Sequence, residues 1–334
     1  MEKRIKERFN DAILHEAMGR YGVAPDKIHL LAGFESFMYE FEREGATYIL
    51  RIGHSFRRSE ALIHGEVDWL NYLAGGGAGV ARALLSAHGR LVEAVDDGQG
   101  EQFLATAFIK AQGGPVWSRG GWSPERYELY GQLLGRMHAL SRDYQVPDPA
   151  WARPQWDDPL FLDIVPYLPA GHKAVADRFR ALTAHLATLS QDRDGYGLIH
   201  FDAHAGNFFI DELDRITLFD FDDCQYSWYA NDLAIVLFYM VMGAEDPAAY
   251  TQDFLSHFLR GYRRENRLDP RWLAEVPSFL KLREIDLYAI IHRSFGPAYL
   301  ENAWCARFMD GRQARIEAGI PYIDFDFESL AGLL

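Results

Sequence analysis

The sequence predicts an α+β protein of two lobes, a small N-terminal lobe with an antiparallel sheet (residues 1–110) and a larger helical C-terminal lobe (residues 111–334). Three observations lead to this prediction. A chain of 334 residues is too long for one small core. Short alternating apolar runs dominate its first third, as in half-buried strands. After Gly113-Gly114-Pro115 the apolar spacing becomes helical.

The N-terminal lobe is predicted to begin with a helix and to continue as a five-stranded sheet with one inserted helix. Ile5, Phe9 and Ile13 recur at helical spacing within residues 4–20. The inserted helix covers residues 59–73 and ends at a run of three glycines. The expected strand segments are residues 27–31, 38–43, 47–52, 81–86, 90–94 and 102–109.

The C-terminal lobe is predicted to be mainly helical. Helices are expected over residues 124–140 and 174–190, with a Trp- and Pro-rich connection between them, and about four more near the C-terminus. The longest apolar run, residues 233–243, is too short to span a bilayer and predicts a buried helix.

Composition narrows the class of protein. Apolar residues make up 49% and charged residues 25% of the chain, which is ordinary for a globular protein. The net charge of −14 argues against nucleic acid or an anionic membrane as the main partner. Two cysteines form no disulfide framework or zinc motif, and the N-terminus lacks a secretory signal. We expect a cytoplasmic protein with a small-molecule partner, and a homodimer stays open.

One stretch, residues 199–233, carries most of the functional information. Asp202 lies two residues after His200 and five before Asn207, and Asp220 closes the apolar run that follows. These offsets match H-x-D-x-x-x-x-N followed by D-F-x, the catalytic loop and metal-binding strand end of kinase-like enzymes. A chance turn is the alternative. The apolar strands expected on both sides of the loop favour the catalytic interpretation.

Phosphoryl transfer needs an oriented acceptor hydroxyl and positive charge on the phosphates. Asp202 is the candidate that orients the hydroxyl and takes its proton, while His200 braces the loop. Asn207 and Asp220 offer the oxygen ligands that Mg²⁺ prefers. The sequence therefore predicts an enzyme that uses ATP and Mg²⁺, although it does not distinguish ATP from GTP.

The stretch resembles the aminoglycoside phosphotransferase superfamily, whose pattern runs H-G-D-x-H-x-G-N, I-D-[FW] and D-L-A. The resemblance implies a two-lobed, protein-kinase-like fold and transfer of the γ-phosphoryl group to a hydroxyl of a small molecule. Phe201 replaces the common glycine, and Asp222 stands where kinases often have glycine. The matching positions are His200, Asp202, His204, Gly206, Asn207, Asp220, Phe221, Asp232, Leu233 and Ala234.

The predicted nucleotide site takes its residues from the N-terminal lobe. Gly33 and Ser36 lie in a turn that could cradle phosphates through backbone N–H groups, although an ordinary hairpin explains it equally well. The resemblance places Arg51 on the nucleotide phosphates, paired with Glu66 or, as the second choice, Glu60. The alternative is a solvent-facing arginine.

Two further sets of residues follow by position. The strand ending near Lys110 should be the hinge, with backbone groups of Ala107 and Ile109 pairing with adenine. Clustered carboxylates in the second lobe suit an amine-bearing acceptor, although simple surface charge is the alternative for each. The candidate acceptor ligands are Asp157, Asp158, Asp222, Asp223, Glu284 and Asp286. Asp222 and Asp223 are also candidates for binding metal.

Two other functions stay open from the sequence. A protein Ser/Thr kinase would share the fold, but only twelve residues separate Asp220 from Asp232, which leaves little room for an activation segment. A catalytically silent kinase-like binding protein is the second alternative. The intact set of Asp202, Asn207 and Asp220 argues against it.

Overall fold

The computed structural model describes the backbone of residues 1–334 and every side chain except those of Leu160 and Phe161. The chain divides into two compact units. Unit 1 contains residues 1–120, 143–153 and 207–222, and unit 2 contains residues 121–142, 154–206 and 223–334. The division predicted at residue 110 differs from this grouping chiefly in the two later segments that return to unit 1.

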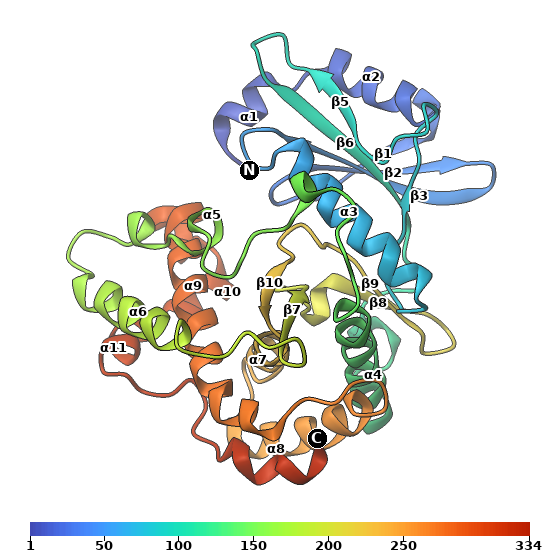
Figure 1. Ribbon diagram of the computed structural model, residues 1–334. Helices are drawn as coiled ribbons and strands as arrows, with labels where there is room; N and C mark the ends of the chain where they lie inside the picture. Colours follow the sequence, from blue (N-terminus) through green and yellow to red (C-terminus); the bar gives the residue numbers. More distant parts are fainter. The chain divides into compact units, whose positions relative to one another are not determined.

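Unit 1 is built on an antiparallel sheet whose order is β1-β2-β3-β6-β4, with β5 also paired to β6 (Figure 1). Helices α1 and α2 precede it, and α3 is inserted after β3. The bounds are α1 Lys3–Arg8, α2 Asp11–Arg20, β1 Ile28–Leu31, β2 Phe37–Arg43, β3 Ala46–His54, α3 Glu60–Gly75, β4 Ala83–Leu84, β5 Glu93–Asp96 and β6 Gln102–Ile109.

The sheet has six strands, so the predicted count of five is wrong. Strand β6 is long enough to pair with β5 at one end, where Glu93 faces Ala105, and with β4 at the other, where Leu84 faces Ala107. The whole other edge of β6 pairs with β3. Two short strands therefore share one edge.

The core of unit 1 lies between the sheet and the first two helices. Ala17 and Tyr21, at the end of α2, are fully buried with Phe41, Leu50 and other sheet residues. The Tyr21 hydroxyl shares its one hydrogen between the carbonyl oxygens of Leu91 and Ala105, which each lie 3.0 Å away. Helix α2 is thereby attached to the β5–β6 side of the sheet.

The later segments of unit 1 join it through backbone contacts. Strands β8 (Phe208–Ile210) and β9 (Ile216–Leu218) form a hairpin. Ile210 exchanges two backbone hydrogen bonds with Gly114, at 2.9 and 3.1 Å. A Cβ on Gly113, which has φ +88°, would come within 2.0 Å of the Ile210 carbonyl oxygen, so the close approach requires glycine.

Unit 2 is mainly helical (Figure 1). Helices α4 and α8 make the most extensive helix–helix contact of this unit. An added Cβ on Gly131 would lie 1.9 Å from the Phe258 carbonyl oxygen, and one on Gly261 would lie 1.9 Å from that of Glu128. Both glycines therefore permit the two backbones to approach each other. The bounds are α4 Pro124–Ser141, α5 Pro159–Leu162, α6 Lys173–Leu186, α7 Tyr229–Met240, α8 Pro247–Tyr262, α9 Val276–Phe295, α10 Ala303–Met309 and α11 Arg312–Glu317.

Helix α7 is the centre of unit 2. It follows directly from strand β10 (Gln225–Trp228), which pairs with β7 (Tyr196–Ile199). Its first ten residues are all buried, as the apolar run predicted. Among the described residues no helix combines the length and apolarity needed to cross a bilayer.

Candidate active site

The loop that carries Asp202 begins where β7 ends, and a buried carboxylate fixes its first turn. Asp232, on the first turn of α7, accepts hydrogen bonds from the backbone N–H groups of His200 (3.0 Å) and Phe201 (2.8 Å). The same carboxylate lies 3.2 Å from His138 Nε2 on α4. The aspartate of the D-L-A motif therefore positions the loop that carries Asp202 from 31 and 32 residues away in the sequence.

The backbone at Phe201 explains the glycine that the family pattern usually has there. Phe201 has φ +67°, a left-handed conformation that costs an ordinary residue about 1–2 kcal/mol. The Asp232 carboxylate holds this residue in place through its N–H. The departure from the pattern is thus accommodated without any change in the loop's anchoring.

The Asp202 carboxylate lies among cationic and imidazole groups. Arg283 Nη2, on α9, donates to Asp202 Oδ1 (2.5 Å), and His204 Nε2 lies 3.4 Å from Oδ2. Burial disfavours the charged form, but Arg283, His204 and His200 outweigh it and hold the pKa of Asp202 below its usual value. Asp202 is therefore ionised at neutral pH and can accept a hydrogen bond from an acceptor hydroxyl.

Arg283 serves two carboxylates and one hydroxyl at once. Its Nη2 also donates to the Tyr239 hydroxyl (2.7 Å), and its Nη1 donates to Asp286 (3.0 Å). Burial raises the pKa of Asp286 to about 6, with Arg283 acting against burial and Asp223 acting with it. The Arg283 guanidinium thus lies between Asp202, whose pKa is lowered, and Asp286, whose pKa is raised.

In unit 1 the two predicted metal ligands flank the β8–β9 hairpin, one before its first strand and one after its second. Asn207 directly precedes β8, and Asp220 follows β9 by two residues. The Phe219 N–H donates to the Asn207 carbonyl (2.8 Å), so the hairpin brings these two positions together. Asp220 has φ +66°. An amide oxygen and a carboxylate in this arrangement fit the ligand preference of Mg²⁺.

Magnesium sites with one or two protein ligands need no dense acidic cluster, because phosphate oxygens and water complete the coordination. Within the described part of the chain, no group of three or more His, Cys, Asp or Glu side chains suits a metal ion. The Asn207 and Asp220 pair is therefore consistent with a metal that arrives with the nucleotide.

Arg51 and Glu66 form the ion pair that the sequence led us to expect, which settles the choice against Glu60. Arg51 Nη1 and Nη2 each lie 2.7 Å from one Glu66 oxygen, and Arg51 Nε donates to Thr106 Oγ1 (3.2 Å). Arg51 is 7% exposed, so it is not a solvent-facing arginine. Burial opposes its charge, but Glu66, Asp222 and Asp220 keep its pKa raised.

A second basic group joins the predicted phosphate loop to the D-F-D segment. A Cβ on Gly33 would lie 2.1 Å from the Ser36 carbonyl oxygen, so the loop requires glycine there. Arg57 Nε is 3.5 Å from the neighbouring Glu35 carboxylate, and Arg57 also forms an ion pair with Asp222. These contacts place a cation at the loop and leave its phosphate-binding role a prediction.

Two of the predicted acceptor ligands already have cationic partners. Asp222 contacts Arg57 and Arg58, and although burial opposes ionisation, these arginines hold its pKa far below the usual range. Glu284 is fully buried and binds Lys281 and Arg312, the latter at 2.7 Å. Both carboxylates already have cationic partners within the protein, as Asp202 and Asp286 have in Arg283, and their contact with an acceptor stays a prediction.

The other acceptor candidates belong to unit 2. Asp157 is exposed, and Asp158 and Asp223 are half-buried. Asp286 is the member of the predicted set that the structure links to Asp202, through Arg283. Contact of these four carboxylates with the acceptor stays a prediction.

The hinge candidates lie at the end of β6. Ala107 pairs with Leu50 on one side and Leu84 on the other. The Ile109 N–H donates to the Arg82 carbonyl (2.9 Å). An adenine contact at this N–H would have to replace the bond to Arg82.

Sequence reasoning missed the basic and aromatic partners of the acidic motif. Arg283 binds Asp202, Tyr239 accepts from Arg283, and Arg57 pairs with Asp222, but none of the three belongs to a short pattern. A signal for Arg283 exists: it lies three residues before Asp286 on an amphipathic helix, where an arginine on the buried face needs anionic partners.

Comparisons with known proteins show the family and the fold of the chain. The model of the phosphotransferase enzyme family matches residues 28–272. The amicoumacin kinase of Bacillus subtilis strain 168 is 38% identical over 335 residues, covering 99% of each chain. A solved structure of the amicoumacin kinase hAmiN in complex with AMP-PNP, Ca²⁺ and Ami has a TM-score of 0.93 at 38% identity, covering 99% of this chain and 100% of that one.

A more distant structure, a microcompartment-associated aminopropanol kinase, has a TM-score of 0.73 at 21% identity over 92% of this chain and 96% of that one, and shares the fold. These matches define a phosphotransferase of the kinase-like fold. The chain belongs to the phosphotransferase enzyme family. The predicted family, fold class and enzyme class are confirmed.

Proposed function

We propose that this protein is an ATP- and Mg²⁺-dependent kinase that phosphorylates a hydroxyl of a small, amine-bearing molecule, with amicoumacin as the first acceptor to test. The observation that carries the proposal is the Asp202 carboxylate, held ionised by Arg283 on a loop with the family's motif. Similarity to an amicoumacin kinase over 99% of both chains supports the choice of acceptor.

In this proposal Asp202 accepts the hydrogen bond of the acceptor hydroxyl and orients its oxygen toward the γ-phosphorus. As the new oxygen–phosphorus bond forms, Asp202 receives the hydroxyl proton, the bond between the γ-phosphorus and the β,γ-bridging oxygen breaks, and ADP leaves. Arg283 keeps Asp202 ionised and fixes its orientation. Asp232 fixes the loop itself. The supporting observation is that each of these groups is held by a named partner within the protein.

Residues of unit 1 serve the nucleotide. Arg51, held flat by Glu66, contributes charge toward the phosphates, and Asn207 and Asp220 would hold the metal. Bound Mg²⁺ neutralises charge on the phosphate oxygens. Arg57 is a further cation beside Asp222.

An amine-bearing acceptor fits the carboxylates of unit 2. Asp202 and Asp286 share one guanidinium, and Asp223 acts on Asp286 electrostatically. The small cavity that Asp286 lines with Phe201 and Trp156 has a volume of about 10 Å³, which is room for a single water molecule.

The test is phosphoryl transfer from ATP, with Mg²⁺, to amicoumacin, amino alcohols, homoserine and aminoglycosides, followed by mass spectrometry of the product. We expect one acceptor to gain a phosphoryl group and Asp202→Asn to lower kcat by at least about a hundredfold. Asp253→Asn is the matched control, because Asp253 is an exposed aspartate of α8 with a side chain that is 66% exposed.

Two results would contradict the proposal. One is an Asp202→Asn variant that turns over as fast as the Asp253→Asn control. The other is labelled phosphate on the protein itself or on added proteins while the small acceptors stay unmodified. The second result would favour a protein kinase.

A further inference from the structure

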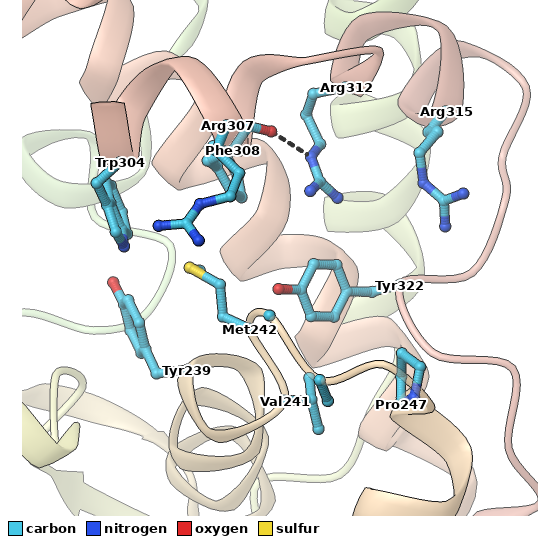
Figure 2. A pocket seen from close by; sticks show the side chains of 12 residues that line it. Tyr239, Val241, Met242, Pro247, Trp304, Arg307, Phe308, Arg312, Arg315 and Tyr322 are labelled. Atoms are coloured by element: carbon cyan, nitrogen blue, oxygen red, sulfur yellow. Dashed lines mark hydrogen bonds between the residues drawn. The ribbon is translucent and has the colours of Figure 1, made fainter. Parts of the chain in front are cut away.

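A pocket of about 400 Å³ opens in unit 2 between the end of α7 and the helices α10 and α11. Residues 239–247 form one wall and residues 304–322 form the other (Figure 2). Trp304, Tyr239 and Met242 gather at one end of it, together with Arg307, while Arg315 lies toward the other end. The pocket is large enough for a ring system of drug-like size.

The walls are basic. Arg307, Arg312 and Arg315 line the pocket, and the described lining residues include no Asp or Glu. Arg312 has Glu284 as its counter-ion. Within the described part of the chain, Arg315 donates only to a neutral carbonyl, that of Pro321 (3.2 Å). Arg307 is exposed and forms no ion pair with a described side chain. Two positive charges therefore face the pocket without a counter-ion among the described residues.

The walls are also aromatic. Trp304 is 39% exposed, and its ring plane is 9° from that of Phe308, with centroids 6.1 Å apart. The Arg312 guanidinium lies over the rings of Phe308 (4.4 Å) and Tyr322 (5.5 Å). Flat aromatic faces and guanidinium planes favour a planar guest that carries acceptor oxygens.

The pocket connects to the catalytic aspartate through Tyr239. The Tyr239 hydroxyl accepts from Arg283 Nη2 (2.7 Å), the same nitrogen that binds Asp202 (2.5 Å). The Tyr239 ring also lies 4.6 Å from the His204 ring, centroid to centroid. A molecule seated between Tyr239 and Trp304 is thus two hydrogen bonds from the carboxylate that orients the hydroxyl.

We propose that this pocket binds a planar aromatic part of the acceptor that carries carboxylate, phenol or carbonyl oxygens. The inference rests on the proposed function and makes the acceptor bipolar. Its amine faces Asp202 and Asp286, and its oxygen-rich ring faces Arg307 and Arg315. The sequence predicted only the acidic half of this recognition.

The binding test uses salicylate as the probe, with benzylammonium as a ring of similar size and opposite charge, titrated calorimetrically into the full chain. Salicylate should bind, and Arg307→Ala combined with Arg315→Ala should weaken it at least about tenfold, because two charge-assisted contacts are lost. Arg180→Ala, an exposed arginine of α6, is the control and should leave binding unchanged. Equal binding to the double variant, or tighter binding of benzylammonium, would overturn the inference.

A kinetic readout separates this inference from the proposed function. With amicoumacin as acceptor, the double variant should raise the KM for the acceptor about tenfold and leave the KM for ATP unchanged. Phosphorylation with an unchanged acceptor KM would overturn the pocket assignment while the function stands. A different pair of results would reject the function and support the pocket. In that case the wild-type protein phosphorylates no small molecule, but the double variant still loses salicylate binding.

Discussion

At the scale of residues, the site depends on one guanidinium. Arg283 donates to Asp202, Asp286 and the Tyr239 hydroxyl from a side chain that is 8% exposed. The forked geometry of arginine permits these simultaneous contacts, and lysine cannot reproduce them. We therefore regard Arg283 as a positioning residue for Asp202, the proposed catalytic base.

Replacing this cation should change both rate and pH dependence. Arg283→Met should lower kcat about tenfold to a hundredfold through misplacement of Asp202. Arg283 lowers the pKa of Asp202, so its removal raises that pKa, and the acidic limb of the kcat profile should move to higher pH. The measurement is kcat against pH with saturating ATP and acceptor.

Arg283→Lys is the companion variant, because it keeps the charge and loses the fork. Compared with Arg283→Met, this variant should move the acidic limb of the kcat profile part of the way back toward its wild-type pH. It should recover little of the lost kcat. A purely structural role for Arg283 would instead lower kcat in both variants without moving the limb.

At the scale of elements, glycines set the distance between α4 and α8. Gly131 and Gly261 face the backbone of the opposite helix at separations that leave no room for a Cβ. The same helix pair carries His138 and Tyr262, whose side chains meet at 2.8 Å above Asp232. The helix contact therefore supports the carboxylate that holds the catalytic loop.

Gly131→Ala should destabilise the protein by about 1–3 kcal/mol, because the added methyl group forces the two helices apart. Chemical denaturation of wild type and variant measures this difference. Gly19→Ala, in α2, is the control, since a Cβ there meets nothing within 4 Å and should stabilise its helix slightly. Equal stability of Gly131→Ala and wild type would show that the helices can separate at no cost.

Most elements were predictable because their signals are local. Apolar spacing found α3, α4, α7 and the hairpin of β2 and β3, close to their observed bounds. The sharing of one edge of β6 by β4 and β5 was not predictable, since strand pairing depends on contacts distant in sequence. The attachment of residues 143–153 to unit 1 had no local signal either, because it depends on the approach of Gly65 to the Trp151 carbonyl.

The site divides in the same way. Asp202, Asn207 and Asp220 stood out because they share one short, ordered pattern. The Arg51–Glu66 pair followed from the family resemblance, with Glu60 as the second choice, and the structure contains it. Arg283, Tyr239 and the basic pocket come from the last hundred residues, where helical spacing indicates burial but not which distant partner each side chain meets.

At the scale of the whole molecule, the chain passes between the two units inside the functional motif. Asp202 belongs to unit 2, and Asn207 and Asp220 belong to unit 1. The residues proposed for the nucleotide all lie in unit 1, and the pocket proposed for the acceptor lies in unit 2. Each ligand should therefore stabilise its own unit.

Mg²⁺ with ATP at a hundred times its Kd should stabilise the protein by about 2.7 kcal/mol, because ligand binds only the folded state. Asp220→Asn should lose most of this stabilisation, whereas Asp214→Asn, the same change in the turn of the same hairpin, should keep it. Thermal melts with and without ligand measure both. A full ligand-induced shift in Asp220→Asn would remove Asp220 from the metal site.

The Asp232 carboxylate also has a consequence for local motion. It accepts from two successive amides of the catalytic loop and is itself wholly buried on α7. Those amide protons can meet solvent only when the helix start and the loop come apart together. In hydrogen–deuterium exchange, the backbone amides of His200 and Phe201 should therefore exchange as slowly as those in the interior of α7. This part of the loop would then be as protected as the core of unit 2.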